Sequence, residues 1–265
     1  MASRSLKVPV SRVHGAGGST PRNAPGVVAA EDEVVVEEPL EIRVNGAPAA
    51  ITMRTPGDDL DLAAGFLWTE GVIDGPDDLR AMATVAENVV DVVLAEGVPA
   101  ARARTADRAL YATSSCGICG KASLERVRSA SGRVVGWSPS DEVVLVLAER
   151  LREAQPTFTR TGGLHGAALF DAEGSVVLAR EDVGRHNALD KLLGARLRAD
   201  ALPLDGLGVV TSSRAGFELV QKCAAAGIGV LVALGAPSSL AIDAARHVGL
   251  HLWAWTRSDR ATRYA

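Results

Sequence analysis

The feature that most restricts the fold is a regular alternation of short apolar runs and helical segments in the second half of the chain. Strands are predicted at 164–170, 175–181, 207–211, 229–234 and 250–255, and helices at 142–155, 187–198, 214–226 and 239–248. The last strands are continuously apolar, which is expected when helices cover both faces of a sheet. Residues 140–265 are therefore predicted to form a three-layer α/β domain.

The first half of the chain predicts less regular structure. Residues 1–24 are rich in Gly, Ser, Pro and Arg and lack hydrophobic periodicity, so we expect a mobile tail. Residues 25–110 are predicted to form a smaller, strand-rich region. Its strands are expected at 33–38, 40–44, 49–54 and 85–94, and its helix at 60–70. Asn45–Gly46 predicts a tight hairpin turn between two of these strands.

Two of the three cysteines lie in a glycine-rich loop, residues 111–122, which we expect to be flexible. Cys116 and Cys119 are spaced C-x-x-C, and a glycine follows each. A reactive cysteine needs a lowered thiol pKa and access to solvent, and the neighbouring Ser, Gly and Lys121 favour both conditions. We interpret the pair as sulfur-handling cysteines.

Four alternatives for the cysteine pair remain open: a buried cysteine, a zinc site, a structural disulfide and a thioredoxin-like redox pair. Zinc needs about four ligands, and the third cysteine, Cys223, lies in a distant predicted helix. His247 and His251 are also far along the chain. A redox pair is expected after a strand near a βαβ unit, whereas this motif lies mid-chain. We predict no metal site.

Bulk properties exclude several classes of protein. Of the 265 residues, 47% are hydrophobic and 23% charged, as in an ordinary globular protein. The net charge of −4 argues against a general nucleic-acid binder, because such binding depends on neutralising phosphates. Residues 160–265 hold 12 Lys/Arg and 10 Asp/Glu, so we expect an anionic small ligand there. Without a signal-peptide-like or membrane-length apolar run, and with an odd cysteine count, we expect a cytoplasmic protein with no membrane attachment.

Two predicted strands lead directly into helices through serine-rich segments, Val209–Ala215 and Val232–Leu240. Open α/β sheets bind ligands beyond the carboxyl ends of their strands, and a helix N-terminus stabilises an anion. We therefore expect phosphate binding at these junctions, with Arg214 close by. The alternative is that Ser213 and Ser238 only cap the helices.

Three further segments concentrate polar side chains. Trp253–Arg260 suits a stacked nucleobase with bound phosphates, or forms a solvated tail. Glu181–Asn187 either orients a ligand or forms a helix N-terminal cluster in which Asp182 pairs with Arg185. His165, on an apolar strand, is more often a core histidine than a catalyst. The chain lacks the P-loop, a usable dinucleotide-binding glycine motif and the His-x-Glu of zinc deaminases.

In sequence order, six segments resemble those of the formate dehydrogenase accessory sulfurtransferase family (FdhD). They are Val36–Gly46, Met53–Leu67, Ser115–Lys121, Thr161–Leu169, Glu181–Lys191 and Thr211–Glu218. The similarity covers about residues 27–260, and six motifs in order are far more specific than one C-x-x-C.

The resemblance implies a sulfur carrier, or sulfurtransferase. It implies transfer of sulfur from a cysteine desulfurase to Mo-bis(molybdopterin guanine dinucleotide), or its tungsten form, before formate dehydrogenase receives that cofactor. The persulfide is implied at Cys116, while Cys119 either resolves it or relays the sulfur. The cofactor-binding residues implied are Trp255, Thr256, Arg257, Ser258, Asp259 and Arg260. Trp255 stands where the family usually has phenylalanine, which preserves an aromatic ring.

The same resemblance implies a cytidine-deaminase-like fold without deaminase chemistry. The implied partners are the desulfurase, formate dehydrogenase and the molybdenum cofactor, and a homodimer is one option for the assembly. Two rival functions stay open: a non-catalytic chaperone that only binds and delivers the cofactor, and a thiol–disulfide oxidoreductase.

Overall fold

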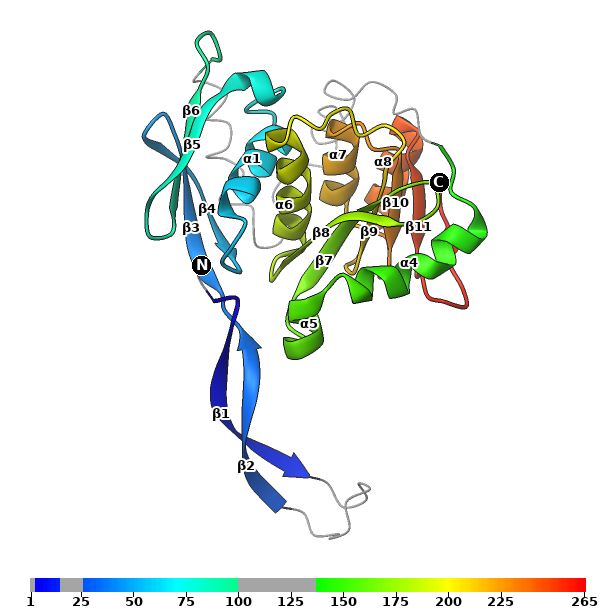
Figure 1. Cartoon of the computed structure of the whole chain (residues 1–265). Helices are drawn as coiled ribbons and strands as arrows, with labels where there is room; N and C mark the ends of the chain where they lie inside the picture. The colour runs from blue at the N-terminus through cyan, green and yellow to red at the C-terminus, as the bar shows by residue number, and fades with distance from the viewer. Residues whose placement is uncertain (1–2, 15–25, 100–136) are drawn as a thin grey trace.

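The computed structural model describes residues 3–14, 26–99 and 137–265. The protein is mixed α/β, with a six-stranded sheet, a four-stranded sheet and a separate two-stranded ribbon (Figure 1). The strands are β1 (Ser5–His14), β2 (Gly26–Val35), β3 (Glu38–Val44), β4 (Ala47–Arg54), β5 (Leu79–Ala86), β6 (Val89–Leu94), β7 (His165–Phe170), β8 (Val176–Asp182), β9 (Gly208–Thr211), β10 (Val230–Ala233), β11 (His251–Ala254) and β12 (Thr262–Arg263). The helices are α1 (Asp59–Thr69), α4 (Asp141–Glu153), α5 (Pro156–Thr161), α6 (Arg185–Arg198), α7 (Phe217–Ala225) and α8 (Ser239–Val248), with a short 3₁₀ helix at Pro76–Asp78.

The six-stranded sheet carries the predicted α/β architecture. Its strand order is β12-β11-β10-β9-β7-β8, and β9, β10 and β11 run parallel. β7 is antiparallel to both β9 and β8, and β12 is antiparallel to β11. The predicted α/β architecture of the second half of the chain is confirmed.

Helices cover both faces of this sheet, which explains why its strands are apolar without alternation. Ala168 and Phe170 of β7 pack under α4, together with Leu147 and Leu151 of that helix. The intervening residues of the same strands belong to the larger core on the opposite face, which includes side chains of α1, α6, α7 and α8. Successive side chains of a strand point to opposite faces, so each strand needs apolar residues at every position.

The four-stranded sheet has the order β4-β3-β6-β5. The predicted turn between β3 and β4 is confirmed, because Asn45 and Gly46 have φ values of 51° and 79°, as a type I′ turn requires. The single strand predicted at 85–94 is wrong. This segment contains the end of β5 and all of β6, which are antiparallel and separated by a turn in which Asn88 has φ 57°.

Helix α1 joins the two halves of the chain. It packs along α6, and two glycines allow the backbones to touch: a Cβ atom at Gly65 would overlap the carbonyl oxygen of Asp190, and one at Gly194 would overlap that of Asp61. The main core accordingly combines residues of the strand-rich region, such as Leu40, with residues of the α/β region as far as Ala254. The strand-rich region and the α/β region share one interior.

Strand β1 lies where a mobile tail was expected, and it forms a two-stranded ribbon with β2. Ser5 to His14 pair residue by residue with Val35 to Gly26, and the ribbon projects away from the body of the molecule (Figure 1). The prediction is wrong for residues 5–14, because the alternation of Leu6, Val8 and Val10 with other residues is a strand pattern that the nearby Gly, Ser and Arg residues obscured.

Smaller differences concern helix ends. α5 begins at Pro156, where only a helix end was predicted, because proline is well tolerated at the first helical position. α7 begins at Phe217, three residues after the predicted start. Among residues 3–14, 26–99 and 137–265, no helix is long and apolar enough to cross a membrane.

Candidate functional site

A cleft of about 830 Å³ lies at the carboxyl ends of the parallel strands. Because β7 is antiparallel to β9, the beginning of β7 reaches the same edge of the sheet. The lining residues are Ala148, Glu149, Arg152, Gln155, Phe158, Gly162, Gly163, Leu164, His165, Val183, Ser212, Leu234, Gly235, Arg257 and Ser258. The cleft therefore lies where ligands bind in open α/β sheets.

The junction after β9 is held by backbone and hydroxyl hydrogen bonds. Gly166 donates its N–H to Ser212 Oγ at 3.0 Å, and the Ser212 N–H donates to the Gly166 carbonyl at 3.0 Å. Ser213 does not cap α7, because its hydroxyl donates to the Arg214 carbonyl at 3.0 Å and the helix begins later. The capping interpretation is confirmed for Ser238, whose Oγ accepts from the N–H of Ala241 at 3.2 Å.

The ends of β9 and β10 approach each other closely at Gly235. The Gly235 N–H donates to the Ser213 carbonyl at 3.0 Å. A Cβ atom at position 235 would lie 2.8 Å from the Ser213 carbonyl oxygen and 2.9 Å from the Arg214 nitrogen. Only glycine fits here without a shift of the backbone, so the main chains that follow β9 and β10 can approach each other at the edge of the cleft.

His165 lies in the wall of the cleft and is partly buried. Its Nδ1 is 3.3 Å from Ser212 Oγ. Burial lowers the pKa of His165, the positive charge of Arg185 lowers it further, and Asp182 opposes both. The imidazole is therefore neutral at pH 7 and able to donate or accept one hydrogen bond. His165 was expected to be an ordinary core residue, but its ring borders the cleft.

The segment Glu181–Asn187 is mainly structural. Glu181 accepts from the N–H groups of Thr157 and Phe158, at 3.1 and 2.7 Å, which holds the start of α5. The predicted pair of Asp182 with Arg185 is wrong: Asp182 binds Lys191 Nζ at 2.7 Å, and both side chains are fully buried.

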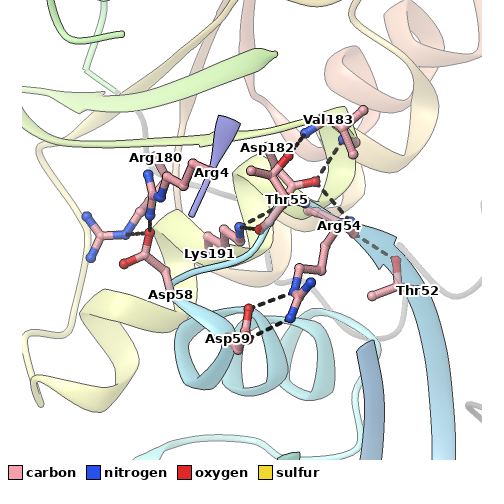
Figure 2. Close-up of polar contacts among 12 residues, drawn as sticks. Arg4, Thr52, Arg54, Thr55, Asp58, Asp59, Arg180, Asp182, Val183 and Lys191 are labelled. Carbon is pink, nitrogen blue, oxygen red and sulfur yellow. Dashed lines mark hydrogen bonds and ion pairs between the residues drawn. The ribbon is translucent and has the colours of Figure 1, made fainter. Parts of the chain in front are cut away.

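Figure 2 shows the surrounding network. The Lys191 Nζ also donates to the Thr55 carbonyl at 2.7 Å, and the Thr55 N–H donates to Asp182 at 3.2 Å. Nearby, Arg4 pairs with Asp58, which ties the base of the β1–β2 ribbon to the segment before α1. The network positions the loop that precedes α1 against α6.

The segment Trp255–Arg260 is only partly at the cleft. Arg257 and Ser258 line it, and Arg257 Nη1 donates to the Leu234 carbonyl at 2.7 Å. Thr256 is fully buried, whereas Trp255 is 48% exposed and has φ 55°, an uncommon conformation for an aromatic residue. Among the described residues, Trp255, Asp259 and Arg260 are not part of the lining. The other tryptophan of the segment, Trp253, is buried under the guanidinium of Arg263, 5.7 Å from the ring centre.

The model of the FdhD/NarQ family matches residues 35–265. The chain belongs to the FdhD/NarQ family. It is 52% identical over 247 residues to the sulfur carrier protein FdhD of Streptomyces avermitilis, covering 88% of this chain and 87% of that protein. The sulfur carrier protein FdhD of Mycobacterium tuberculosis is 44% identical over 257 residues, covering 91% and 93%.

A solved structure supports the same relationship for this FdhD/NarQ protein. The crystal structure of a protein described as a formate dehydrogenase accessory protein, from Desulfotalea psychrophila, superimposes with a TM-score of 0.75 at 25% identity. The superposition covers 98% of this chain and 96% of that chain. The resemblance stated from the sequence motifs is thus confirmed at the level of the family.

The predicted catalytic cysteines of this family member, Cys116 and Cys119, lie outside the described residues. The third cysteine, Cys223, is fully buried in α7, and burial raises the pKa of its thiol to about 12. At neutral pH this thiol is protonated and inaccessible, so it is not suited to sulfur chemistry. Within the described part of the chain, no group of three or more His, Cys, Asp or Glu side chains is placed to hold a metal ion.

Sequence reasoning missed Gln155, Phe158 and Arg152, which form the α4–α5 side of the cleft. Gln155 is 3% exposed, and its side-chain nitrogen has no hydrogen-bond partner among the described residues. A Cβ atom at Gly166 would overlap the Gln155 amide, so this glycine makes room for it. The sequence contains only an indirect signal for Gln155: it precedes Pro156 and is the last residue of the helix predicted at 142–155.

Proposed function

We propose that this FdhD/NarQ protein is a sulfur carrier that takes sulfur from a cysteine desulfurase as a persulfide on Cys116. It passes that sulfur to the Mo-bis(molybdopterin guanine dinucleotide) cofactor, or its tungsten form, for formate dehydrogenase. The names of the related proteins, sulfur carrier and formate dehydrogenase accessory protein, support the sulfur-carrying role and the link to formate dehydrogenase. The proposed setting is the cytoplasm.

The cleft is the observation that carries the cofactor-binding part. Arg152 and Arg257 bring two positive charges to it against the single carboxylate of Glu149. A guanidinium suits phosphate oxygens because it offers a planar set of donors. The half-buried ring of Phe158 offers a face for a heterocycle. The unpartnered amide of Gln155 is a buried polar group that gains a partner when a polar ligand enters.

The chemistry of the cysteines supports the sulfur-carrying part. The chain has three cysteines. Burial of Cys223 removes one of them from consideration, so any thiolate that accepts sulfur belongs to Cys116 or Cys119. The similarity of Ser115–Lys121 to the family's C-x-x-C motif supports Cys116 as the residue that carries the persulfide. The role of Cys119, which either forms a disulfide with Cys116 or relays the sulfur, is part of the proposal.

In the loading step, the Cys116 thiolate attacks the terminal sulfur of the desulfurase persulfide. A new sulfur–sulfur bond forms and gives Cys116–S–SH. The sulfur–sulfur bond of the desulfurase persulfide breaks, and the desulfurase cysteine leaves as a thiolate. No external oxidant is needed, because the transferred sulfur keeps its oxidation state. The phosphates of the cofactor's guanine dinucleotide are held at the strand ends by Arg257, Ser258 and the main chain near Gly235.

The loading step is tested by intact mass after incubation with a cysteine desulfurase and cysteine. We expect a gain of ~32 Da, one sulfur atom, that dithiothreitol removes. The gain is lost in Cys116→Ala and kept in Cys223→Ala, the matched control for a buried thiol. An unchanged mass gain in Cys116→Ala would refute the assignment of the persulfide.

The rival functions predict different results. A chaperone that only delivers the cofactor would still support formate dehydrogenase activity when Cys116 and Cys119 are both replaced by serine. A thiol–disulfide oxidoreductase would reduce insulin when coupled to a reductase. We also propose that the α/β region is related to the cytidine-deaminase fold. The helices on both faces of the sheet support this relationship.

A further inference from the structure

Among the residues that line the cleft, Glu149 is the one acid. It lies on α4, three positions before Arg152, and this spacing places both side chains on the same face of the helix. Within the described part of the chain, Glu149 makes no hydrogen bond or ion pair, although Arg152 is its neighbour on that face. Its exposed carboxylate is therefore free to accept hydrogen bonds from a ligand.

The two sides of the cleft differ in chemistry. The strand ends offer hydroxyl groups and the guanidinium of Arg257, which suit phosphate. Besides Arg152, the α4–α5 side has the carboxylate of Glu149, the amide of Gln155 and the half-buried ring of Phe158. A carboxylate weakens the binding of phosphate, because like charges repel. The acid in this cleft therefore points to a part of the ligand that donates hydrogen bonds.

Guanine has the hydrogen-bonding edge that fits this side of the cleft. Its ring N–H and its 2-amino group are adjacent donors in one plane, and the two oxygens of a carboxylate can accept from both. Next to these donors lies the carbonyl oxygen of guanine, an acceptor. Adenine, cytosine and uracil each lack two adjacent donors, so a carboxylate in the same place faces at least one acceptor of those bases.

Gln155 supplies a second observation on the same side. Its side chain is 3% exposed, and its amide nitrogen has no partner among the residues that the structure describes. A buried donor without a partner gains free energy when a ligand brings an acceptor. If the amide turns toward the cleft, the carbonyl oxygen of guanine is such an acceptor, beside the two donors that Glu149 accepts.

We propose that Glu149 selects guanine over other bases, by accepting hydrogen bonds from the ring N–H and the 2-amino group of the nucleotide in the cleft. This inference rests on the proposed function, which puts a guanine dinucleotide there, and adds the residue that recognises the base. The phosphates then lie at the strand ends, the base stacks on Phe158, and the edge of the base meets Glu149. Glu149 determines specificity and takes no part in sulfur transfer.

Calorimetric titration of the full chain with three nucleoside diphosphates tests the selectivity. Inosine diphosphate lacks only the 2-amino group, and we expect it to bind about tenfold more weakly than guanosine diphosphate, because one hydrogen bond to a charged group is lost. Adenosine diphosphate is expected to bind at least about a hundredfold more weakly. Absence of guanosine diphosphate binding would overturn the proposed function together with this inference. Equal affinity for the guanosine and inosine nucleotides would overturn the inference alone.

Glu149→Gln tests the residue itself. Glutamine keeps one acceptor but presents its amino group to the second donor of guanine, so the preference for guanosine over inosine diphosphate should fall to within about twofold. The variant should also bind xanthosine diphosphate more tightly than the wild type does, because xanthine has a carbonyl oxygen in place of the 2-amino group. This gain distinguishes a change of specificity from a damaged fold.

The matched control is Glu153→Gln. Glu153 is an exposed acid one turn further along α4, and it is not among the residues that line the cleft. We expect this variant to keep the wild-type preference for guanosine diphosphate. An unchanged preference in Glu149→Gln, or an equal loss of preference in Glu153→Gln, overturns the assignment of Glu149.

Discussion

Replacement of Lys191 by methionine tests whether the buried network between α6 and the Thr55 loop stabilises the fold. The Lys191 ammonium is fully buried, binds Asp182 at 2.7 Å and donates to the Thr55 carbonyl at 2.7 Å. Burial lowers the pKa of Lys191, and the negative charge of Asp182 opposes that shift. Methionine keeps most of the side-chain volume but removes the charge and the donors.

The expected loss follows from what remains around Asp182. Removing one partner of a buried ion pair costs about 3–5 kcal/mol, because the other charge stays buried. Asp182 still accepts from the Thr55 N–H, the Gly184 N–H and Asn187 Nδ2, at 3.2, 2.8 and 3.2 Å. These donors compensate part of its charge, so we expect a loss at the lower end, about 3 kcal/mol of unfolding free energy.

Urea unfolding followed by circular dichroism measures this loss. With an m-value of about 3 kcal/mol/M, the midpoint should fall by about 1 M. The matched control is Lys7→Met, because the Lys7 side chain is 72% exposed and should change stability by less than about 0.5 kcal/mol. The double variant Asp182→Asn with Lys191→Met should lose less than the sum of the single variants. Equal midpoints for Lys191→Met and Lys7→Met would refute the reasoning.

Two further predictions concern a histidine and a glycine. Burial lowers the pKa of His186 to about 3, so the unfolded chain takes up a proton below about pH 6.5 that the folded protein does not. The free energy of unfolding should therefore fall as the pH is lowered from about 6.5 toward 3. His186→Gln should reduce the difference in urea midpoint between pH 7 and pH 5, whereas the control His247→Gln, at an exposed position, should not. An unchanged difference in His186→Gln would contradict this role of His186. Gly235→Ala should lower the free energy of unfolding by about 1–3 kcal/mol, as overpacking does, and should weaken the binding of guanosine diphosphate measured by calorimetry. The control is Gly75→Ala, whose added Cβ meets no atom within 4 Å; it should change neither the stability nor the binding. Unaltered binding in a folded Gly235→Ala protein would show that the strand ends do not hold the nucleotide.

Much of the fold was predictable because its signals are local. The continuous apolar strands, the helices between them and the Asn45–Gly46 turn follow from side-chain periodicity and backbone preference. Strand β1 was missed because polar and apolar residues alternate there among Gly, Ser and Arg residues that are typical of tails. The division of 85–94 into two strands depends on a left-handed Asn88, for which the sequence offers only a weak signal.

The candidate site was predictable only in part. The strand ends near Ser212 and Gly235 follow from the rule for open α/β sheets. Gln155 and Arg152 reach the cleft through the packing of α4 across the sheet, and long-range packing leaves no local pattern. The partner of Asp182 was misassigned for the same reason: Lys191 is the seventh residue of α6, and its ammonium reaches back to the residues just before the start of that helix.

The contact of α1 with α6 has a consequence for the cysteine segment. These helices come from opposite sides of residues 100–136, and at Gly65 and Gly194 their main chains touch directly. A protease cut anywhere in that stretch would leave two fragments that remain one particle, held by a shared interior. Cys116 and Cys119 thus belong to a segment that is preceded and followed by parts of the chain that share one hydrophobic core.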